Sequence, residues 1–307
     1  MKHYKLVIIG SGPAGLTAGV YAARANLKPL IVAGLTYGGQ LMLTTEVENF
    51  PGFPNGIMGP ELMQNMISQA ERFGAEIVYD DAMKTDFSSK PYKIEVGKET
   101  YTADAVIVAT GASALWLGVE TEEKFRGKGV SSCATCDGFF FKGREIIVVG
   151  GGDSAMEEAS YLTKFASKVT LMHRRDSFKA SKIMQDRVLN NAKISVMYNT
   201  TIQEFLGDEK LRAVKTKDTV TGEEKEMPIE GVFVAIGHKP NTSLFEGQLD
   251  LDDKGYINPI DNTKTKVPGV FVAGDVRDYR YRQAISAAGM GCMAALDAEH
   301  YLGMDHG

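Results

Sequence analysis

The segments Lys5–Gly15 (KLVIIGSGPAG) and Glu145–Ala155 (EIIVVGGGDSA) decide the fold. Each begins with a run of large aliphatic residues, continues into a glycine-rich loop and then enters a stretch of small residues typical of a closely packed helix. A second aliphatic run follows each of them, at Pro29–Val32 and at Val169–Met172. A strand, a glycine loop, a helix and a second strand open a dinucleotide-binding domain, so the sequence predicts two such domains.

A further repeat indicates that the two domains share a plan. Val106–Gly111 (VIVATG) follows the first opening, Val232–Gly237 (VFVAIG) follows the second, and a third copy lies at Val270–Asp275 (VFVAGD). Polar hairpins are expected around Gly97 and Gly222, between short strand-like segments. We therefore predict an α/β protein with two Rossmann-like, three-layer domains.

Composition and net charge exclude several classes of protein. The chain has 307 residues, of which 44% are hydrophobic and 24% charged, as is typical of a globular protein with sizeable cores. The net charge of −5 argues against binding to nucleic acid or to an anionic membrane. No segment approaches the roughly 18 consecutive apolar residues of a membrane helix. We therefore expect a cytoplasmic protein with no nucleic-acid or membrane partner.

The glycines of the two loops have separate physical roles. Gly10 allows a tight turn, Gly12 lets backbone N–H groups approach a pyrophosphate, and Gly15 permits close packing of helix on strand. The phosphate charge would then lie at the N-terminus of the following helix, where free N–H groups and the helix dipole favour it. The second loop repeats this pattern at Gly150, Gly152 and Ala155.

The residues after each second strand distinguish the two ligands. His173, Arg174, Arg175 and Lys179 follow the second one, where an NAD site normally has a carboxylate and an NADP site has arginine for the 2′-phosphate. This pattern favours NADPH. After the first one the chain reads Ala-Gly-Leu, with no acidic residue. The ribose of the first ligand must then be bound by the loop 34–40, or the adenosine of that ligand must be bound in another way.

The cysteines suggest redox chemistry. Cys133 and Cys136 form a C-x-x-C that could be a redox dithiol, half of a zinc site or an accident. A structural zinc needs four ligands, and Cys292 with scattered histidines does not supply them, so we expect no metal. If a helix begins at Cys133, its dipole would lower the thiol pKa. Asp137 is either a proton donor or part of an Asp-Gly turn, and Cys292 is expected to be a small buried residue.

Taken together, the chain resembles the low-molecular-weight thioredoxin reductases of the pyridine-nucleotide disulfide reductase class over essentially its whole length. The motifs that carry the resemblance are GSGPAG (10–15), GGQL (38–41), TEVENFPG (45–52), ATGA (109–112), CATCDG (133–138), GGGDSAMEEA (150–159), HRRDSFKAS (173–181), AIGHKPN (235–241), VFVAGD (270–275) and YRQAISAAG (281–289).

The resemblance implies an FAD domain interrupted by an NADPH domain. It places the FAD domain at 1–113 and 243–307, and the NADPH domain with the C-x-x-C at 114–242. The FAD residues it implies are Gly10, Gly12, Pro13, Ala14, Gly15, Gly38, Gly39, Gln40, Asn49, Ala109, Thr110, Gly111, Gly274, Asp275, Arg282, Gln283 and Ala284. The NADPH residues are Gly150, Gly152, Asp153, Ser154, Ala155, Glu157, His173, Arg174, Arg175, Lys179, Ile236 and Gly237.

The resemblance also implies a reaction and its partners. FAD would take electrons from NADPH and reduce a Cys133–Cys136 disulfide through Cys136, after which Cys133 would attack the disulfide of thioredoxin, with Asp137 as the acid. The family works as a homodimer. Lys179 stands where an arginine is common, which keeps the charge and loses the bidentate geometry. Another carrier protein, or a redox sensor without turnover, would fit the same residues; flavin–NADP reductases that serve ferredoxin lack the C-x-x-C.

Overall fold

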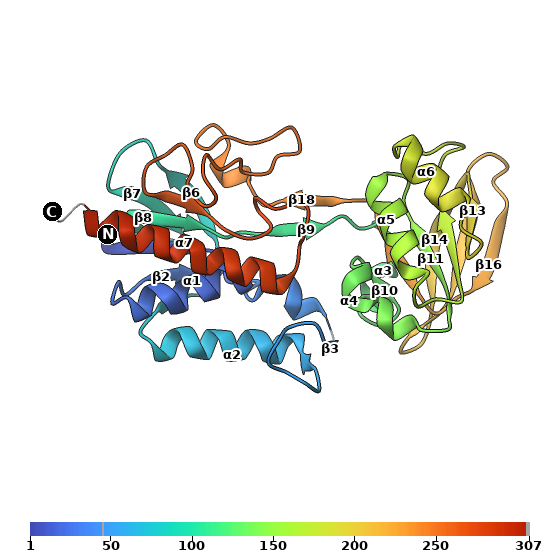
Figure 1. Ribbon diagram of the computed structural model, residues 1–307, viewed down its shortest axis with the longest axis horizontal. Coiled ribbons are helices and arrows are strands. Elements are labelled where there is room, and N and C mark those ends of the chain that lie inside the picture. The colour runs from blue at the N-terminus through green and yellow to red at the C-terminus, as the bar shows by residue number, and fades with distance from the viewer. Residues whose placement is uncertain (45, 305–307) are drawn as a thin grey trace. The chain divides into compact units, whose positions relative to one another are not determined.

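The computed structural model describes residues 1–44 and 46–304. Thr45 of the TEVENFPG motif and the last three residues of the predicted segment 243–307 lie outside the described residues. The chain divides into unit 1, residues 1–113 with 239–307, and unit 2, residues 114–238 (Figure 1). The chain crosses between the units twice, at β9 (Ala112–Ala114) and β18 (His238–Pro240), which pair with each other. The assignment of FAD to the first of these units and of NADPH to the second remains a prediction.

A mixed sheet, parallel over most of its width and antiparallel at one edge, forms the centre of unit 1. Its strand order is β5-β2-β1-β8-β7-β6, with β19 beside the end of β8. In register, Ile9 lies opposite Val32 and Val108, and Val108 lies opposite Val272, so four strands end side by side. The strands are β1 (Lys2–Ile9), β2 (Leu30–Val32), β5 (Glu76–Val78), β6 (Ala82–Asp86), β7 (Tyr92–Val96), β8 (Glu99–Val108) and β19 (Val270–Val272).

Alternation along β1 builds a core on each face of this sheet. Leu6 and Ile8 pack toward the helices α1, α2 and α7, while Val7 and Ile9 pack toward the β6–β7 hairpin and the segment 244–257. Figure 1 shows α1 between α2 and α7. The helices are α1 (Pro13–Arg24), α2 (Gly59–Arg72) and α7 (Ala284–Met304), and the short elements are η1 (Gly39–Leu43), β3 (Glu46–Val47), β4 (Ile57–Met58) and η3 (Ser243–Phe245).

Unit 2 repeats this layering. A parallel sheet in the order β10-β17-β11-β12-β13 has helices on one face and the antiparallel meander β14-β15-β16 on the other. The strands are β10 (Val130–Ser131), β11 (Glu145–Val149), β12 (Lys168–Met172), β13 (Ile194–Met197), β14 (Thr200–Gly207), β15 (Leu211–Asp218), β16 (Glu224–Pro228) and β17 (Val232–Val234). The helices are α3 (Glu122–Phe125), α4 (Ala134–Asp137), η2 (Gly138–Phe141), α5 (Asp153–Leu162) and α6 (Lys182–Leu189).

The predicted fold class is therefore confirmed: two Rossmann-like units, each with three layers. The repeated segments Val106–Gly111, Val232–Gly237 and Val270–Asp275 contain the ends of β8, β17 and β19, which stop at Val108, Val234 and Val272. A glycine with positive φ follows each strand within three residues, as at Gly111, where φ is 67°, and Gly237, where φ is 114°.

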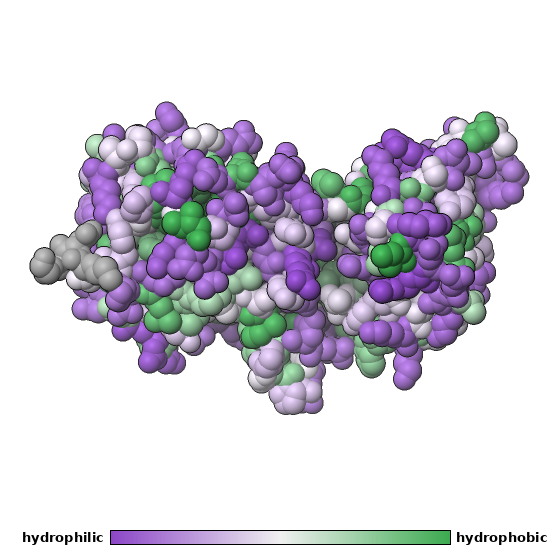
Figure 2. All heavy atoms as spheres, turned by 45° about the horizontal axis from the view of Figure 1, so that its top comes forward, coloured by the Kyte–Doolittle hydropathy of each residue, from purple (hydrophilic) through white to green (hydrophobic). Residues whose placement is uncertain are grey.

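The surface is largely hydrophilic, as expected for a chain in which 24% of the residues are charged. Hydrophilic side chains predominate on the face shown in Figure 2, and the hydrophobic ones form small separate groups. Within residues 1–44 and 46–304, no helix is long and apolar enough to cross a membrane.

The packing of α7 on α1 depends on one glycine. A Cβ at Gly291 would collide with the carbonyl oxygen of Ala14 in α1, whereas a Cβ at Gly289, in the same helix, would meet nothing within 4 Å. We expect Gly291→Ala to lower the free energy of unfolding by about 2 kcal/mol, because the helices must separate. Gly289→Ala should raise it by up to ~1 kcal/mol through helix propensity. Chemical denaturation measures both, and equal effects would contradict this packing.

Candidate functional site

The first glycine loop lies where β1 ends and α1 begins. The N–H of Gly10 donates to Val32 O at 2.9 Å, and the N–H of Ala109 donates to Ile9 O at 2.8 Å, so the loop is joined to the ends of both neighbouring strands. A Cβ at Gly10 would collide with the Ala109 carbonyl, and one at Gly15 would collide with the Gly10 carbonyl. The loop and the first turn of α1 are therefore in van der Waals contact with the end of the sheet.

Gly12 differs from these two glycines. It is the N-cap of α1, with Pro13 in the first turn, and a Cβ on it would meet nothing within 4 Å. Its backbone therefore faces open space, with the free N–H groups of a twelve-residue helix directed there. This arrangement suits a pyrophosphate, such as that of FAD.

The loop 34–40 is fixed to the first glycine loop by Ser11. The Ser11 hydroxyl donates to Ala33 O at 2.8 Å and accepts from the N–H of Gly38 at 2.9 Å. A Cβ on Gly39 would lie 3.2 Å from Gly12 Cα. Gly38, Gly39 and Gln40 thus lie beside the first loop, although no carboxylate follows β2. Ser11 was not among the predicted residues; it occupies a variable position of the glycine motif, so the motif carried no signal for it.

Several other predicted FAD residues also come together in unit 1. Thr110 Oγ1 donates to Asn241 O at 2.7 Å, which holds Ala109–Gly111 against the returning chain. Gly274 follows β19, and a Cβ there would lie 2.9 Å from Ala14 Cβ. Asn49 Nδ2 donates to Gln283 Oε1 at 3.3 Å, directly before α7 begins at Ala284.

Asp275 is the charged group at this edge of the sheet. Burial raises the pKa of Asp275 to about 6, and the neighbouring Asp278 carboxyl adds to the shift while Arg282 opposes it. A half-buried carboxyl without an ion-pair partner among the described residues suits a ligand that donates hydroxyl hydrogen bonds. The ribityl chain of a flavin is such a ligand.

The second glycine loop has the same construction. The N–H of Gly150 donates to Met172 O at 3.0 Å, the N–H of Ala235 donates to Val149 O at 2.8 Å, and a Cβ on Gly150 would collide with the Ala235 carbonyl. Gly152 is the N-cap of α5, and a Cβ on it would meet nothing within 4 Å. This loop therefore also offers an open helix N-terminus, and Ile236 and Gly237 follow the neighbouring strand β17.

The segment after β12 returns to this second loop. Lys179 N–H donates to Gly151 O at 2.8 Å, and Asp153 Oδ1 accepts from Ser181 N–H at 2.7 Å. Asp153 therefore has a structural partner within the chain. Ser154 and Glu157 of α5 are exposed on the first turns of that helix.

The cations of this segment are free to bind an anion. Arg174, Arg175 and Lys179 are exposed, and none forms an ion pair within the part of the chain that the structure describes. The ring of His173 lies against Gly151, and its Nε2 is buried with no hydrogen-bond partner among the described residues. Burial lowers the pKa of His173. These groups fit the phosphates of NADPH.

The dithiol lies at the end of β10, in the same parallel sheet as the second glycine loop. Cys133 and Cys136 form a disulfide, with 5.3 Å between their Cα atoms. Cys133 is the N-cap of α4, which has four residues, and Asp137 N–H donates to Cys133 O at 3.1 Å. Asp137 is thus the last residue of a short helix that continues into η2. A helix of this length supplies little dipole to Cys133.

Asp137 is a partly buried acid beside this disulfide. Burial raises the pKa of Asp137, and a hydrogen bond with the Ser131 side chain opposes that shift. Ser131 was not predicted as a site residue. Nothing in the sequence around Ser131 indicated that it would influence Asp137.

The remaining predictions concern Cys292 and the binding of a metal. Cys292 is half-buried rather than buried, and its thiol raises the pKa of Tyr21 in α1. No group of three or more His, Cys, Asp or Glu side chains that could hold a metal occurs in residues 1–44 and 46–304.

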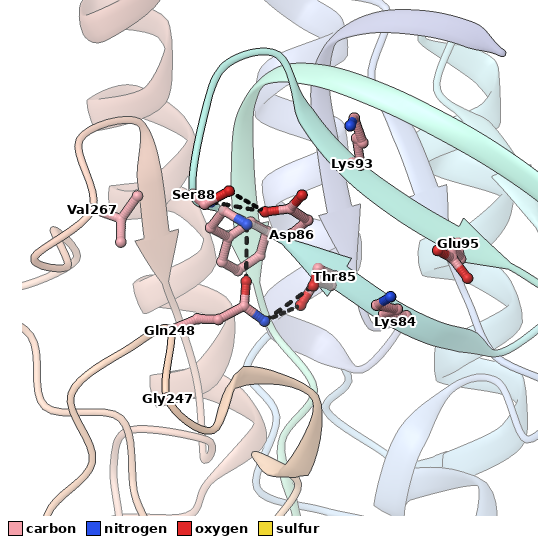
Figure 3. Close-up of a pocket in the computed structure, with 10 residues that line it drawn as sticks. Lys84, Thr85, Asp86, Ser88, Lys93, Glu95, Gly247, Gln248 and Val267 are labelled. Atoms are coloured by element: carbon pink, nitrogen blue, oxygen red, sulfur yellow. Dashed lines mark hydrogen bonds between the residues drawn. The ribbon is translucent and has the colours of Figure 1, made fainter.

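A pocket of about 670 Å³ in unit 1 contains none of these residues. Figure 3 shows Gln248 of its lining beside Thr85, where Nε2 donates to Thr85 O at 3.1 Å and Oε1 accepts from Phe87 N–H at 2.8 Å. Gln248 therefore joins β6 to the segment that follows η3, which is a structural role.

Comparison with known proteins gives a consistent result. A family model described as pyridine nucleotide-disulphide oxidoreductase matches residues 4–291. A thioredoxin reductase of Rickettsia conorii is 54% identical over 303 residues, covering 97% of this chain and 98% of the relative. One from Mycolicibacterium smegmatis is 55% identical over 300 residues, covering 97% and 96%. The solved thioredoxin reductase from Giardia duodenalis has a TM-score of 0.94 at 47% identity, covering 99% and 100%.

Asp275 gives the flavin-free protein a distinct pH dependence. The native carboxyl, with a pKa of about 6, binds its proton more tightly than the unfolded chain, where the pKa is about 3.9. Stability should therefore fall as pH rises from 4 to 6. We expect Asp275→Asn to remove this slope and to raise the free energy of unfolding by about 2–3 kcal/mol at pH 7. Urea unfolding across this pH range tests it, with exposed Asp253→Asn as the control; an unchanged slope would contradict the assignment.

Proposed function

The chain belongs to the pyridine nucleotide-disulphide oxidoreductase family, and we propose that it is an NADPH-dependent thioredoxin-disulfide reductase. The observation that carries the proposal is the Cys133–Cys136 disulfide at the edge of the sheet that bears the second glycine loop. A disulfide with a partly buried acid one residue away, in a protein with two nucleotide-binding loops, is suited to passing electrons from a nucleotide to another disulfide.

The two loops hold different molecules in this proposal. The first loop, with the segment 34–40, Asp275 and the start of α7, holds FAD, and the second loop with Arg174 and Arg175 holds the phosphates of NADPH. FAD supplies the chemistry that joins a two-electron hydride donor to a disulfide. Gly12 and Gly152 admit the pyrophosphates because their backbones face open space.

Exchange with the protein substrate is carried out by the chain's own residues. The reduced Cys133 thiolate attacks one sulfur of the thioredoxin disulfide, that S–S bond breaks, and the leaving sulfur takes a proton from Asp137. The Asp137 carboxylate next takes the proton of Cys136, and the Cys136 thiolate attacks Cys133 in the mixed disulfide. This step reforms the Cys133–Cys136 bond, and the second thioredoxin sulfur leaves as a thiolate that takes this proton from Asp137. Thioredoxin is released with two thiols, so two electrons and two protons have passed to it.

The predicted homodimer and cytoplasmic location remain proposals. In support of the dimer, Ile285, Met293 and Leu296 of α7 and Tyr21 of α1 are large apolar or aromatic side chains that are exposed. A second copy of the chain would cover them.

The resolving role of Cys136 can be tested directly. We expect Cys136→Ser to abolish NADPH-dependent reduction of thioredoxin, because the mixed disulfide at Cys133 can no longer be released. Cys292→Ser should keep near wild-type turnover, since Cys292 lies in α7 and takes no part in the Cys133–Cys136 disulfide. Steady-state NADPH oxidation with thioredoxin measures both, and substantial turnover by Cys136→Ser would overturn the mechanism.

The choice of NADPH rests on two exposed guanidinium groups. Replacing Arg174 and Arg175 with Ala should raise the KM for NADPH by about 10- to 100-fold, because charge-assisted bonds to the 2′-phosphate are lost. The KM for NADH should change little. Arg187→Ala, an exposed arginine of α6 in the same unit, is the control. Equal changes for both nucleotides would mean that these arginines do not bind the 2′-phosphate.

A further inference from the structure

The segment that follows β5 brings a carboxylate to the end of β2. The residues directly after β2, at 33–35, include no acid. β5 is the neighbour of β2 in the sheet, with Val78 opposite Val32, and Asp81 comes three residues after β5 ends. The N–H of Leu35 donates to Asp81 Oδ1 at 2.9 Å. The Asp81 side chain therefore lies at the end of β2 although it belongs to the segment after the next strand of the sheet.

Gly34 shows how closely this carboxylate approaches. Its φ is 81°, and a Cβ on it would lie 3.2 Å from Asp81 Oδ1. The carboxylate oxygen thus lies next to the space in which a side chain of residue 34 would begin. Gly34 stands about 20 residues after the glycine loop, where a dinucleotide-binding domain normally has the carboxylate that binds a ribose. The chain combines a glycine at this position with an acid delivered from elsewhere.

Asp81 is fixed by contacts on both sides of its backbone. Its N–H donates to Asp80 Oδ1 at 2.8 Å, and its carbonyl oxygen accepts from the N–H of Gly97 at 3.2 Å. The rings of Tyr37 and Tyr79 also meet edge to face, with 5.1 Å between their centroids. The loop after β2 and the segment after β5 are therefore joined at two points, and the position of the carboxylate is defined without a ligand.

The same loop also contacts the glycine loop that suits a pyrophosphate. Ser11 donates to Ala33 O and accepts from the N–H of Gly38, and the backbone of Gly12 faces open space. In FAD the ribose of the adenosine is bonded directly to the pyrophosphate. A ligand with its pyrophosphate at Gly12 would therefore have its ribose beside the loop that Asp81 contacts.

The chemistry of Asp81 suits ribose hydroxyls. The side chain is exposed, and in residues 1–44 and 46–304 it has no side-chain hydrogen bond or ion pair other than the bond from Leu35. A carboxylate has about four lone-pair sites, so it can still accept from hydroxyl donors. It would repel a 2′-phosphate, which the exposed Arg174 and Arg175 of unit 2 would attract.

We propose that Asp81 binds the ribose hydroxyls of the adenosine half of FAD, and so supplies the carboxylate that the chain lacks after β2. This inference rests on the proposed function, since it takes the first glycine loop to hold FAD. It assigns a ligand contact to a residue outside the glycine motif, on the segment that follows β5.

The test compares Asp81→Asn with Asp80→Asn in the full chain freed of flavin. Both changes remove one negative charge and keep an oxygen acceptor for the existing backbone donor. The ligands are FAD and an analogue whose adenosine is 2′,3′-dideoxyadenosine, and titration of flavin fluorescence gives the Kd of each. We expect Asp81→Asn to bind FAD about tenfold more weakly than wild type, because a neutral amide oxygen replaces a charged acceptor.

The loss of affinity should require the ribose hydroxyls. Asp81→Asn should bind the dideoxy analogue within about twofold of wild type, because the contact that it weakens is absent there. Asp80→Asn should match wild type with both ligands. Equal weakening for FAD and the analogue would mean that Asp81 only holds the loop through Leu35, and would overturn the inference, as would an unchanged Kd for FAD. The titration contains neither thioredoxin nor NADPH, so a failure of the proposed reductase would appear in turnover and leave these Kd values unchanged.

Discussion

Both nucleotide loops depend on the same close contact between a glycine and the end of the neighbouring strand. Gly10 lies against the Ala109 carbonyl in unit 1, and Gly150 lies against the Ala235 carbonyl in unit 2, in each case closer than any side chain would allow. The flanking hydrogen bonds are also equivalent: each glycine N–H donates to the end of the second strand, at Val32 O or Met172 O. Because parallel strands end at one edge, this contact sets where every other loop of the site can lie.

The sequence predicted the parts of this arrangement that have a repeated local signature. The two strand–loop–helix openings, the parallel sheets and the C-x-x-C can be read from KLVIIGSGPAG, EIIVVGGGDSA and CATC, because each pattern has a direct physical cause. Ser11, Ser131 and the half-exposed Cys292 could not be read in this way. Each depends on contacts made through space, such as Ser11 with Gly38, for which the neighbouring residues give no signal.

The chemistry of the proposed reductase follows from what is buried and what is left open. Gly12 and Gly152 face open space and Arg174 and Arg175 are exposed, so these groups are available to ligands. Asp137 and Asp275 are partly buried, and burial raises the pKa of each. A carboxyl with a raised pKa remains a proton donor at higher pH, which an acid in thiol exchange requires.

The central claim is that electrons from NADPH reach the Cys133–Cys136 disulfide only through bound FAD. The most direct measurement adds NADPH anaerobically to FAD-loaded and FAD-free protein, traps the thiols with an alkylating reagent and locates them by peptide mass spectrometry. We predict alkylation of both Cys133 and Cys136 in the FAD-loaded protein and of neither in the FAD-free protein, with Cys292 labelled equally in both. A disulfide that stays intact while NADPH is oxidised and the flavin absorbance is lost would contradict it.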